Sequence, residues 1–233
     1  MKKNNVNLFE FFDQESPYAT EFRRLLHNLN GAITGDKTKI ILITSAMLAE
    51  GKSTIAAFLA MTAAGKKKRK TLLVDCDLRR PTIHKLFNVA REGGVVEALT
   101  QNKPLKEVTK RTSQEYLDIV TAGKTVHTPT DVFDSAAIHK LLDESRFYYD
   151  LILVDCAPIL PVSDPMLLAP LMDGVIMVLK AGSTQREVAE RATRLLKNNK
   201  ANFLGIVLNN ITNALPYYYN ESYYGYEYKT RED

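Results

Sequence analysis

Nine residues near the first quarter of the chain, Ala46–Thr54 (AMLAEGKST), have the spacing of a phosphate-binding loop. In such a loop, backbone N–H groups at the start of a helix surround a polyphosphate, and the helix dipole adds positive charge. Lys52 would add a point charge for the outer phosphates, and the Ser53 hydroxyl would bind Mg²⁺. A chance match at a strand–helix turn is the alternative, but a strand pattern before the loop and a helix pattern after it argue against chance. The residues predicted to bind the nucleotide phosphates are Ala49, Glu50, Gly51, Lys52, Ser53 and Thr54.

Two alanines in this loop, Ala46 and Ala49, stand where such loops often carry glycine. A positive φ angle costs energy at any residue that has a Cβ atom. The loop must therefore avoid positive φ at these two positions or absorb the strain.

Acidic residues follow two further hydrophobic segments, as Asp75-Cys76-Asp77-Leu78-Arg79 and as Asp155-Cys156. In open α/β sheets, ligands bind at the carboxyl ends of the strands, where these acids are expected to lie. One aspartate at a strand end is usually only a turn former. Three acids beside a phosphate loop instead indicate a shared cation, and Mg²⁺ would offset their repulsion. Arg79 and Arg80 would pair with phosphate or a neighbouring acid, or form a plain surface ion pair; the sequence leaves these readings open.

Short hydrophobic segments alternate with longer helical patterns along the chain, which predicts a mostly parallel sheet with helices on both faces. The predicted strands are nearly continuous in apolar residues, so we expect both of their faces to be buried. The strands are predicted at Lys39–Ser45, Thr71–Asp75, Leu117–Thr121, Leu151–Asp155, Gly174–Leu179 and Phe203–Asn209. The helices are predicted at Lys52–Ala64, Thr82–Phe87, Val95–Thr100, Asp131–Ser145 and Thr184–Asn198.

Composition narrows the class of protein. The 233 residues are 45% hydrophobic and 25% charged, which excludes a disordered or fibrous chain. A net charge of +4 is too small to indicate nucleic acid as a partner. The two cysteines form no disulfide framework, so a reducing cytoplasm is expected. No apolar run is long enough to span a membrane.

The basic run Gly65–Lys70 (GKKKRK) predicts a solvated turn or, alternatively, attraction to an anionic membrane or an acidic partner.

The C-terminal segment is dominated by tyrosine, with seven of the eleven tyrosines of the chain and almost no aliphatic residue. Such a segment cannot bury enough apolar surface to order itself, which predicts a mobile tail over residues 214–233 after a domain of residues 1–213. Exposed hydroxyls on an accessible tail suit kinase substrates, whereas an aromatic strip packed on the core is the alternative. The candidate phosphorylation sites are Tyr217, Tyr218, Tyr219, Tyr223, Tyr224, Tyr226 and Tyr228.

These motifs together resemble the bacterial tyrosine kinases, autokinases of capsule and exopolysaccharide synthesis that share a scaffold with the MinD/ParA ATPases. The resemblance is carried by Ala46–Thr54, by LLVDCDLRRP at Leu72–Pro81 and by LILVDCAP at Leu151–Pro158. MinD and ParA proteins usually carry an additional early lysine in the phosphate loop, and this loop lacks it.

The resemblance implies a role for each matching residue. Lys52 and Asp77 would be catalytic residues. Ser53, Asp77 and Asp155 would hold Mg²⁺. Asp75 would be the base for a tyrosine hydroxyl. Asn209 matches the position that reads the adenine edge in related ATPases, with a strand-end turn residue as the alternative.

The resemblance also implies partners. A helix over residues 17–30 would carry an oligomerisation motif, here Glu21, Arg24 and His27, with His27 in place of the family's last arginine, and a ring would form through it. ATP and Mg²⁺ would be the cofactors, and a transmembrane polysaccharide co-polymerase would activate the kinase at the inner face of the plasma membrane. A tyrosine phosphatase would reverse the reaction. The alternatives are a MinD/ParA-like membrane-positioning ATPase and a catalytically silent nucleotide-binding adaptor.

Overall fold

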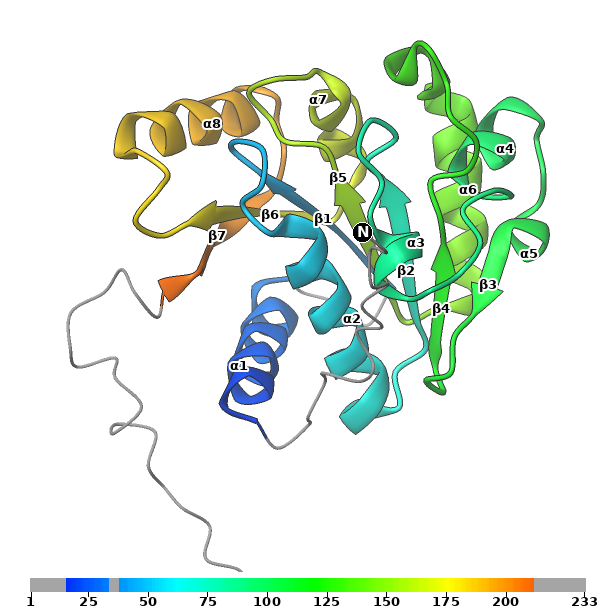
Figure 1. Cartoon of the computed structure of the whole chain (residues 1–233), viewed down its shortest axis with the longest axis horizontal. Coiled ribbons are helices and arrows are strands. Elements are labelled where there is room, and N and C mark those ends of the chain that lie inside the picture. The colour runs from blue at the N-terminus through cyan, green and yellow to red at the C-terminus, as the bar shows by residue number, and fades with distance from the viewer. Residues whose placement is uncertain (1–15, 34–37, 212–233) are drawn as a thin grey trace, which may run out of the picture.

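A computed structural model describes residues 16–33 and 38–211, and a seven-stranded sheet forms its centre (Figure 1). The strand order is β3-β4-β2-β5-β1-β6-β7, and every pair is parallel except β3 with β4. The strands are β1 (Lys39–Ser45), β2 (Thr71–Cys76), β3 (Thr109–Arg111), β4 (Leu117–Val120), β5 (Leu151–Cys156), β6 (Gly174–Lys180) and β7 (Phe203–Asn209). The predicted mostly parallel sheet is therefore confirmed.

Helices cover both faces of the sheet because side chains of each central strand point alternately to opposite faces (Figure 1). In β1, Ile40 and Leu42 pack on one face and Ile41 and Ile43 on the other. One face is covered by α1 (Pro17–Ala32), α2 (Lys52–Lys67) and α3 (Ile83–Leu86). The other face is covered by α4 (Val95–Thr100), α5 (Leu105–Val108), α6 (Ser135–Tyr148), α7 (Asp164–Leu168) and α8 (Arg186–Asn198), with the 3₁₀ turns η2 (Pro129–Val132) and η3 (Ala169–Leu171).

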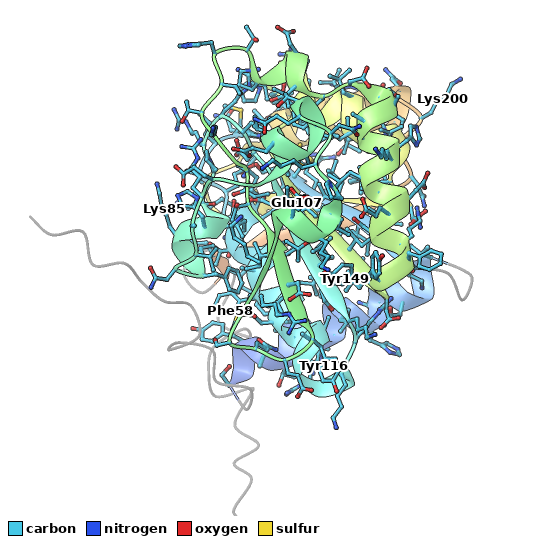
Figure 2. The ribbon with its side chains drawn as sticks, turned by 90° about the vertical axis from the view of Figure 1, so that its right-hand side faces the viewer. Phe58, Lys85, Glu107, Tyr116, Tyr149 and Lys200 are labelled. Atoms are coloured by element: carbon cyan, nitrogen blue, oxygen red, sulfur yellow. The ribbon has the colours of Figure 1, made fainter. Side chains whose placement is uncertain are left out.

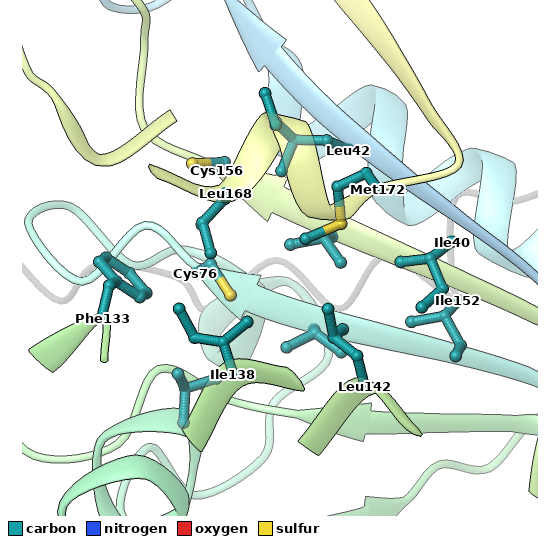
Figure 3. Close-up of a cluster of buried hydrophobic side chains, with 14 of the residues drawn as sticks. Ile40, Leu42, Cys76, Phe133, Ile138, Leu142, Ile152, Cys156, Leu168 and Met172 are labelled. Atoms are coloured by element: carbon teal, nitrogen blue, oxygen red, sulfur yellow. The ribbon is translucent and has the colours of Figure 1, made fainter. Parts of the chain in front are cut away.

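The second of these faces contains both cysteines. Figure 3 shows Cys76 and Cys156 among apolar side chains that include Leu42, Leu168 and Met172. Both thiols are free and buried, and burial raises their pKa well above the usual value. They serve as small core residues in this structure.

The edge strand β7 differs from the expectation of a strand buried on both faces. Its residues are half-buried or exposed, with Ile206 at 47% and Leu208 at 51% exposure. The apolar pattern of this strand matches that of the central strands, but β7 has a neighbour on one side only. The apolar pattern of a strand shows which side chains it carries, and it does not show whether the strand lies at the centre or at the edge of the sheet.

Three further differences from the predicted elements are local. The single helix predicted over Asp131–Ser145 is divided into η2 and α6, because the Asp134 side chain caps α6 by accepting from the backbone N–H of Ala137 at 3.0 Å. The strand β3 was not predicted, since it is three residues long and polar. The predicted helix over Thr82–Phe87 is a single turn, Ile83–Leu86.

The N-terminal helix α1 packs its apolar side on α2 and ends close to the predicted boundary. Leu26 and Leu29 are buried, and the rings of Phe22 and Phe58 lie 5.3 Å apart between their centroids. Ser16 caps the helix by accepting from the backbone N–H of Ala19 at 3.2 Å. Across residues 16–33 and 38–211, no helix has the length and apolar character needed to cross a bilayer.

Candidate active site

The phosphate loop connects β1 to α2 at the carboxyl edge of the sheet. Ala49 has φ 61° and Gly51 has φ 91°, so the loop absorbs the strain at Ala49 and avoids it at Ala46, whose φ is negative. A Cβ atom at Gly51 would lie 2.1 Å from the amide nitrogen of Asn209, so only glycine fits there. No side chain caps the first turn of the 16-residue helix α2. Its backbone N–H groups are thus oriented as an anion site requires.

Glu50 fixes the shape of this loop from the inside. Its side chain is 3% exposed and accepts one hydrogen bond from the backbone N–H of Met47 at 2.7 Å and another from the Thr184 hydroxyl. The Asn209 amide donates to the Glu50 carbonyl at 2.9 Å and so attaches the end of β7 to the loop. The side chains of Glu50 and Asn209 therefore shape and support the loop in this structure.

Lys52 lies within the cluster of acids that the sequence predicts. Its ammonium nitrogen is 2.7 Å from Asp77 Oδ2, 3.4 Å from Asp155 Oδ1 and 3.1 Å from the Ser53 hydroxyl. Burial lowers the pKa of Lys52, but Asp155 and Asp77 outweigh this effect and raise it well above its usual range. Lys52 is therefore a permanent cation that can be shared between carboxylates and phosphate.

Asp75 lies beside Asp155 in the register of β2 and β5, and its side chain is fully buried. Its Oδ1 accepts from the backbone N–H of Asp77, and its Oδ2 accepts from the N–H groups of Thr82 and Ile83, all at 3.2 Å. Burial and the nearby Asp155 raise the pKa of Asp75 to about 8, although Lys52 opposes the shift. This carboxylate is a stronger base than an exposed one, and it is held by the backbone at the start of α3.

Asp155 provides the structural evidence for a cation. The residue is fully buried, and its Oδ2 has no hydrogen-bond partner. Burial raises its pKa, and Lys52 partly opposes this effect. An unpartnered buried carboxylate oxygen beside the Ser53 hydroxyl and Asp77 fits a hard cation that prefers oxygen ligands.

Few protein side chains at this site are available as metal ligands. Among the described side chains, no group of three or more His, Cys, Asp and Glu is placed to hold a metal. Mg²⁺ typically keeps water and substrate phosphates and takes only one or two carboxylates from the protein. The set formed by Ser53, Asp77 and Asp155 therefore fits Mg²⁺ bound together with a nucleotide.

A hydrogen-bond network around the buried Asp164, which sequence reasoning missed, joins the segment after β2 to η2 and α7 at this edge. Arg79 Nε donates to Asp164 Oδ2 at 2.9 Å, and Arg79 Nη2 donates to the Thr130 hydroxyl at 2.7 Å. The Thr130 hydroxyl donates to Asp164 Oδ1 at 2.6 Å. Asp164 is fully buried, so Arg79 is paired with an internal acid two residues from Asp77. Pro165 after Asp164 signals a helix start, but no sequence pattern indicates the partner of Arg79.

The remaining predicted residues lie outside this cluster. Glu21 and Arg24 form an exposed ion pair on α1 at 2.7 Å, and His27 is exposed one turn later. The tail tyrosines 217–228 lie outside the described residues. The structure brings together Lys52, Ser53, Asp75, Asp77 and Asp155, with Asn209 on the loop beside them.

Comparison with known proteins identifies the family of this chain. The ParA family model, described as NUBPL iron-transfer P-loop NTPase, matches residues 36–227. The chain is 32% identical over 203 residues to the tyrosine-protein kinase YwqD of Bacillus subtilis, covering 87% of this chain and 85% of YwqD. It is 31% identical to the succinoglycan biosynthesis transport protein ExoP of Rhizobium meliloti, over 83% of this chain and 25% of ExoP.

The solved structures agree with these relatives. The kinase domain of the Escherichia coli tyrosine kinase ETK superposes with a TM-score of 0.83 at 25% identity, covering 93% of this chain and 86% of that one. This chain therefore belongs to the bacterial tyrosine kinases, which are built on the ParA-type P-loop scaffold.

Proposed function

We propose that this chain transfers the γ-phosphoryl group of ATP to tyrosines of its own C-terminal tail, in an Mg²⁺-dependent reaction. The observation that carries this proposal is the contact of Lys52 with two strand-end carboxylates, one of which has an unpartnered buried oxygen. The tail offers seven tyrosines: Tyr217, Tyr218, Tyr219, Tyr223, Tyr224, Tyr226 and Tyr228.

The phosphate loop would bind the nucleotide mainly through backbone N–H groups from Ala49 to Thr54. Lys52 would exchange part of its contact with Asp77 and Asp155 for the outer phosphates, since an ammonium group binds phosphate as a point charge. Ser53, Asp77 and Asp155 would hold Mg²⁺, which supplies charge neutralisation at the transferring phosphoryl group. The amide of Asn209, which donates to the Glu50 carbonyl in this structure, would read the adenine edge of the bound nucleotide.

Asp75 would accept the proton of the attacking tyrosine. A neutral phenol with a pKa of about 10 is a poor nucleophile. The raised pKa of Asp75, about 8, brings the two groups closer in proton affinity than an ordinary carboxylate would be. The phenol oxygen forms the new bond to phosphorus, the bond to the ADP oxygen breaks, and the proton passes to Asp75. Asp75 is fully buried in this structure, so the turn at the start of α3 would have to shift before a phenol could reach the carboxylate.

The kinase would act in polysaccharide polymerisation and export. The relative ExoP is named as a succinoglycan transport protein, and this chain matches a quarter of its length. We propose that a transmembrane co-polymerase activates this chain at the cytoplasmic face of the membrane, and that a tyrosine phosphatase resets it. Glu21, Arg24 and His27 on the exposed side of α1 would contribute to a ring of subunits.

Mass spectrometry of the purified chain after incubation with Mg·ATP tests the reaction. We expect phosphate on the tail tyrosines, none after Lys52→Met, and nucleotide binding without transfer after Asp75→Asn. Arg80→Ala serves as a matched control, because Arg80 is exposed beside the site. Absence of phosphotyrosine even with the activator's cytoplasmic segment present, despite bound nucleotide, would identify a silent adaptor instead. Full transfer by Asp75→Asn would refute its role as base.

A further inference from the structure

A second charged region lies at the opposite edge of the sheet from the phosphate loop. Lys68 and Lys70 are exposed on the connection from α2 into β2, and Phe147 and Tyr148 are exposed at the end of α6, at 89% and 59%. Both segments precede a parallel strand, so they share the amino edge of the sheet. The phosphate loop follows the carboxyl end of β1, about 23 Å away along a seven-residue strand.

Backbone contacts fix the two segments side by side. The Asp150 N–H donates to the Lys70 carbonyl at 2.8 Å, and the Lys70 N–H donates to Asp150 Oδ2 at 3.0 Å. The Arg69 guanidinium donates to the Asp150 carbonyl at 2.9 Å. The lysines and the aromatic pair therefore form one rigid surface.

A cavity of about 970 Å³ extends this surface toward the β3 edge. It is lined by Lys70, Lys106 and Arg111 together with Tyr116, Tyr148 and Tyr149, and Figure 2 labels Tyr116 and Tyr149 on this side of the molecule. Its acids are Glu115 and Asp118, and Asp118 accepts a hydrogen bond from the Tyr149 hydroxyl at 2.9 Å.

Cations outnumber acids among residues 68–70, the lining of the cavity and Asp150. The cations are Lys68, Arg69, Lys70, Lys106 and Arg111, and the acids are Glu115, Asp118 and Asp150. Asp118 and Asp150 are each engaged in a hydrogen bond. Asp143 precedes Phe147 by one turn, about 6 Å, on the same face of α6, and Glu144 accepts from the backbone N–H of Leu105 at the cavity.

We propose that this surface docks directly on a membrane that contains anionic phospholipid. Exposed aromatic rings insert at the headgroup level, and lysines beside them are attracted to the negative surface potential. The cations are spread over two segments and both sides of a cavity, which suits a planar array of charges better than a single phosphotyrosine. Docking in this orientation leaves the phosphate loop on the side of the molecule that faces away from the bilayer.

Vesicle co-sedimentation tests the proposal with the full chain and no partner protein. We expect binding to phosphatidylcholine vesicles that contain one third phosphatidylglycerol, weak binding to pure phosphatidylcholine, and loss of binding at high salt. The triple variant Lys68→Gln/Lys70→Gln/Lys106→Gln should lower the partition coefficient on the order of 100-fold. Phe147→Gln should lower it about tenfold.

Matched variants distinguish this surface from general charge. Lys85→Gln/Lys124→Gln/Arg186→Gln removes three exposed cations that follow the carboxyl ends of strands, at the opposite edge of the sheet, and should preserve binding, as should Lys52→Met, which separates docking from catalysis. Nucleotide binding in solution confirms that each surface variant is folded.

Several outcomes would overturn the proposal. These are equal binding to both vesicle types, an equal loss in the control triple variant, and displacement from vesicles by a phosphorylated tail peptide whose binding needs the same three lysines. The last result would identify the cavity as a phosphopeptide site.

Discussion

At the carboxyl edge of the sheet, Asp75, Asp77 and Asp155 are almost completely buried around one lysine, whereas the lysines of the proposed docking surface are exposed to water. Buried charges interact strongly and tolerate little displacement, while exposed charges are screened by salt and act as a diffuse field. The difference teaches that the same residue types serve two kinds of recognition. The buried set suits a ligand of defined geometry, and the exposed set suits a surface.

Among the substitutions that test this difference between the two edges, we expect the largest effect on catalysis at Lys52. Lys52→Met removes the cation that pairs with Asp77 and Asp155, and we expect tail phosphorylation to fall more than about 1000-fold. The matched control is Lys103→Met, since Lys103 is exposed outside both regions, and its rate should stay within about twofold. Single-turnover labelling with Mg·ATP measures both variants. A residual rate above a tenth of the starting value would contradict the central place of Lys52.

The network around Asp164 tests whether residues next to the buried acids also help to position them for catalysis. Arg79→Ala frees the loop that carries Asp77, and we expect transfer to fall about 10–100-fold while nucleotide affinity changes less than about threefold. Arg79→Lys should restore little, because one ammonium cannot replace a planar group that reaches both Asp164 and Thr130.

Arg80→Ala is the control for this network, because it keeps the backbone N–H that donates to Asp77 Oδ1 at 2.9 Å. The measurement is kcat separated from KM for ATP. An equal loss in the two arginine variants would show that the effect is electrostatic and not positional.

Buried acids should also cost stability when no nucleotide is bound. Burial raises the pKa of Asp75 to about 8 and that of Asp155 above its usual range, so both groups hold protons more tightly in the folded state. The contribution of Asp75 to stability is complete below a pH of about 4 and is lost as the pH rises through about 8, and that of Asp155 is lost in the same direction.

Asp155→Asn removes one of these ionisations and retains the contact with Lys52 through its amide oxygen. We expect the free energy of unfolding without nucleotide to increase by about 1 kcal/mol at about pH 8 and to change little at about pH 5. Stabilisation by Mg·ADP should disappear. Urea unfolding at both pH values measures these effects, and a loss of stability that is equal at both would count against the assignment.

The smallest expected effect is in the phosphate loop. Ala49→Gly relieves a residue held at positive φ and should stabilise the chain by about 0.5–1 kcal/mol. Ala46→Gly is the same substitution at a buried residue with negative φ and should destabilise it by a similar amount. Thermal unfolding of the pair checks the sign, and equal signs would show that backbone strain at Ala49 is unimportant.

Much of the fold follows from local sequence. Lys39–Ser45 and Phe203–Asn209 are strands at the predicted residues, because apolar runs bounded by polar turns leave little choice of boundary. The division at Asp134 depends on one capping hydrogen bond, and β3 depends on pairing with β4. Neither contact leaves a periodic pattern in the sequence.

The site follows from sequence in its acids and its lysine, since all of them end or begin elements that topology brings to one edge. The residues that hold the site in place do not follow from the sequence. Asp164 contacts Arg79 across 85 positions, and Thr184 contacts Glu50 across 134. Such distant pairs are set by the packing of loops, and a single sequence does not encode them in its spacing.

The hydrogen bond between Asn209 and Glu50 places the end of β7 at the rim of the nucleotide loop. Tyr217 follows Asn209 by eight residues, a leash that reaches at most about 28 Å. A substrate tethered at so short a radius reaches millimolar local concentration at its own subunit. The active site of a neighbouring subunit reaches that tyrosine only from within the same distance. The spacing between subunits, more than affinity for the peptide, would therefore govern phosphorylation of one subunit's tail by another.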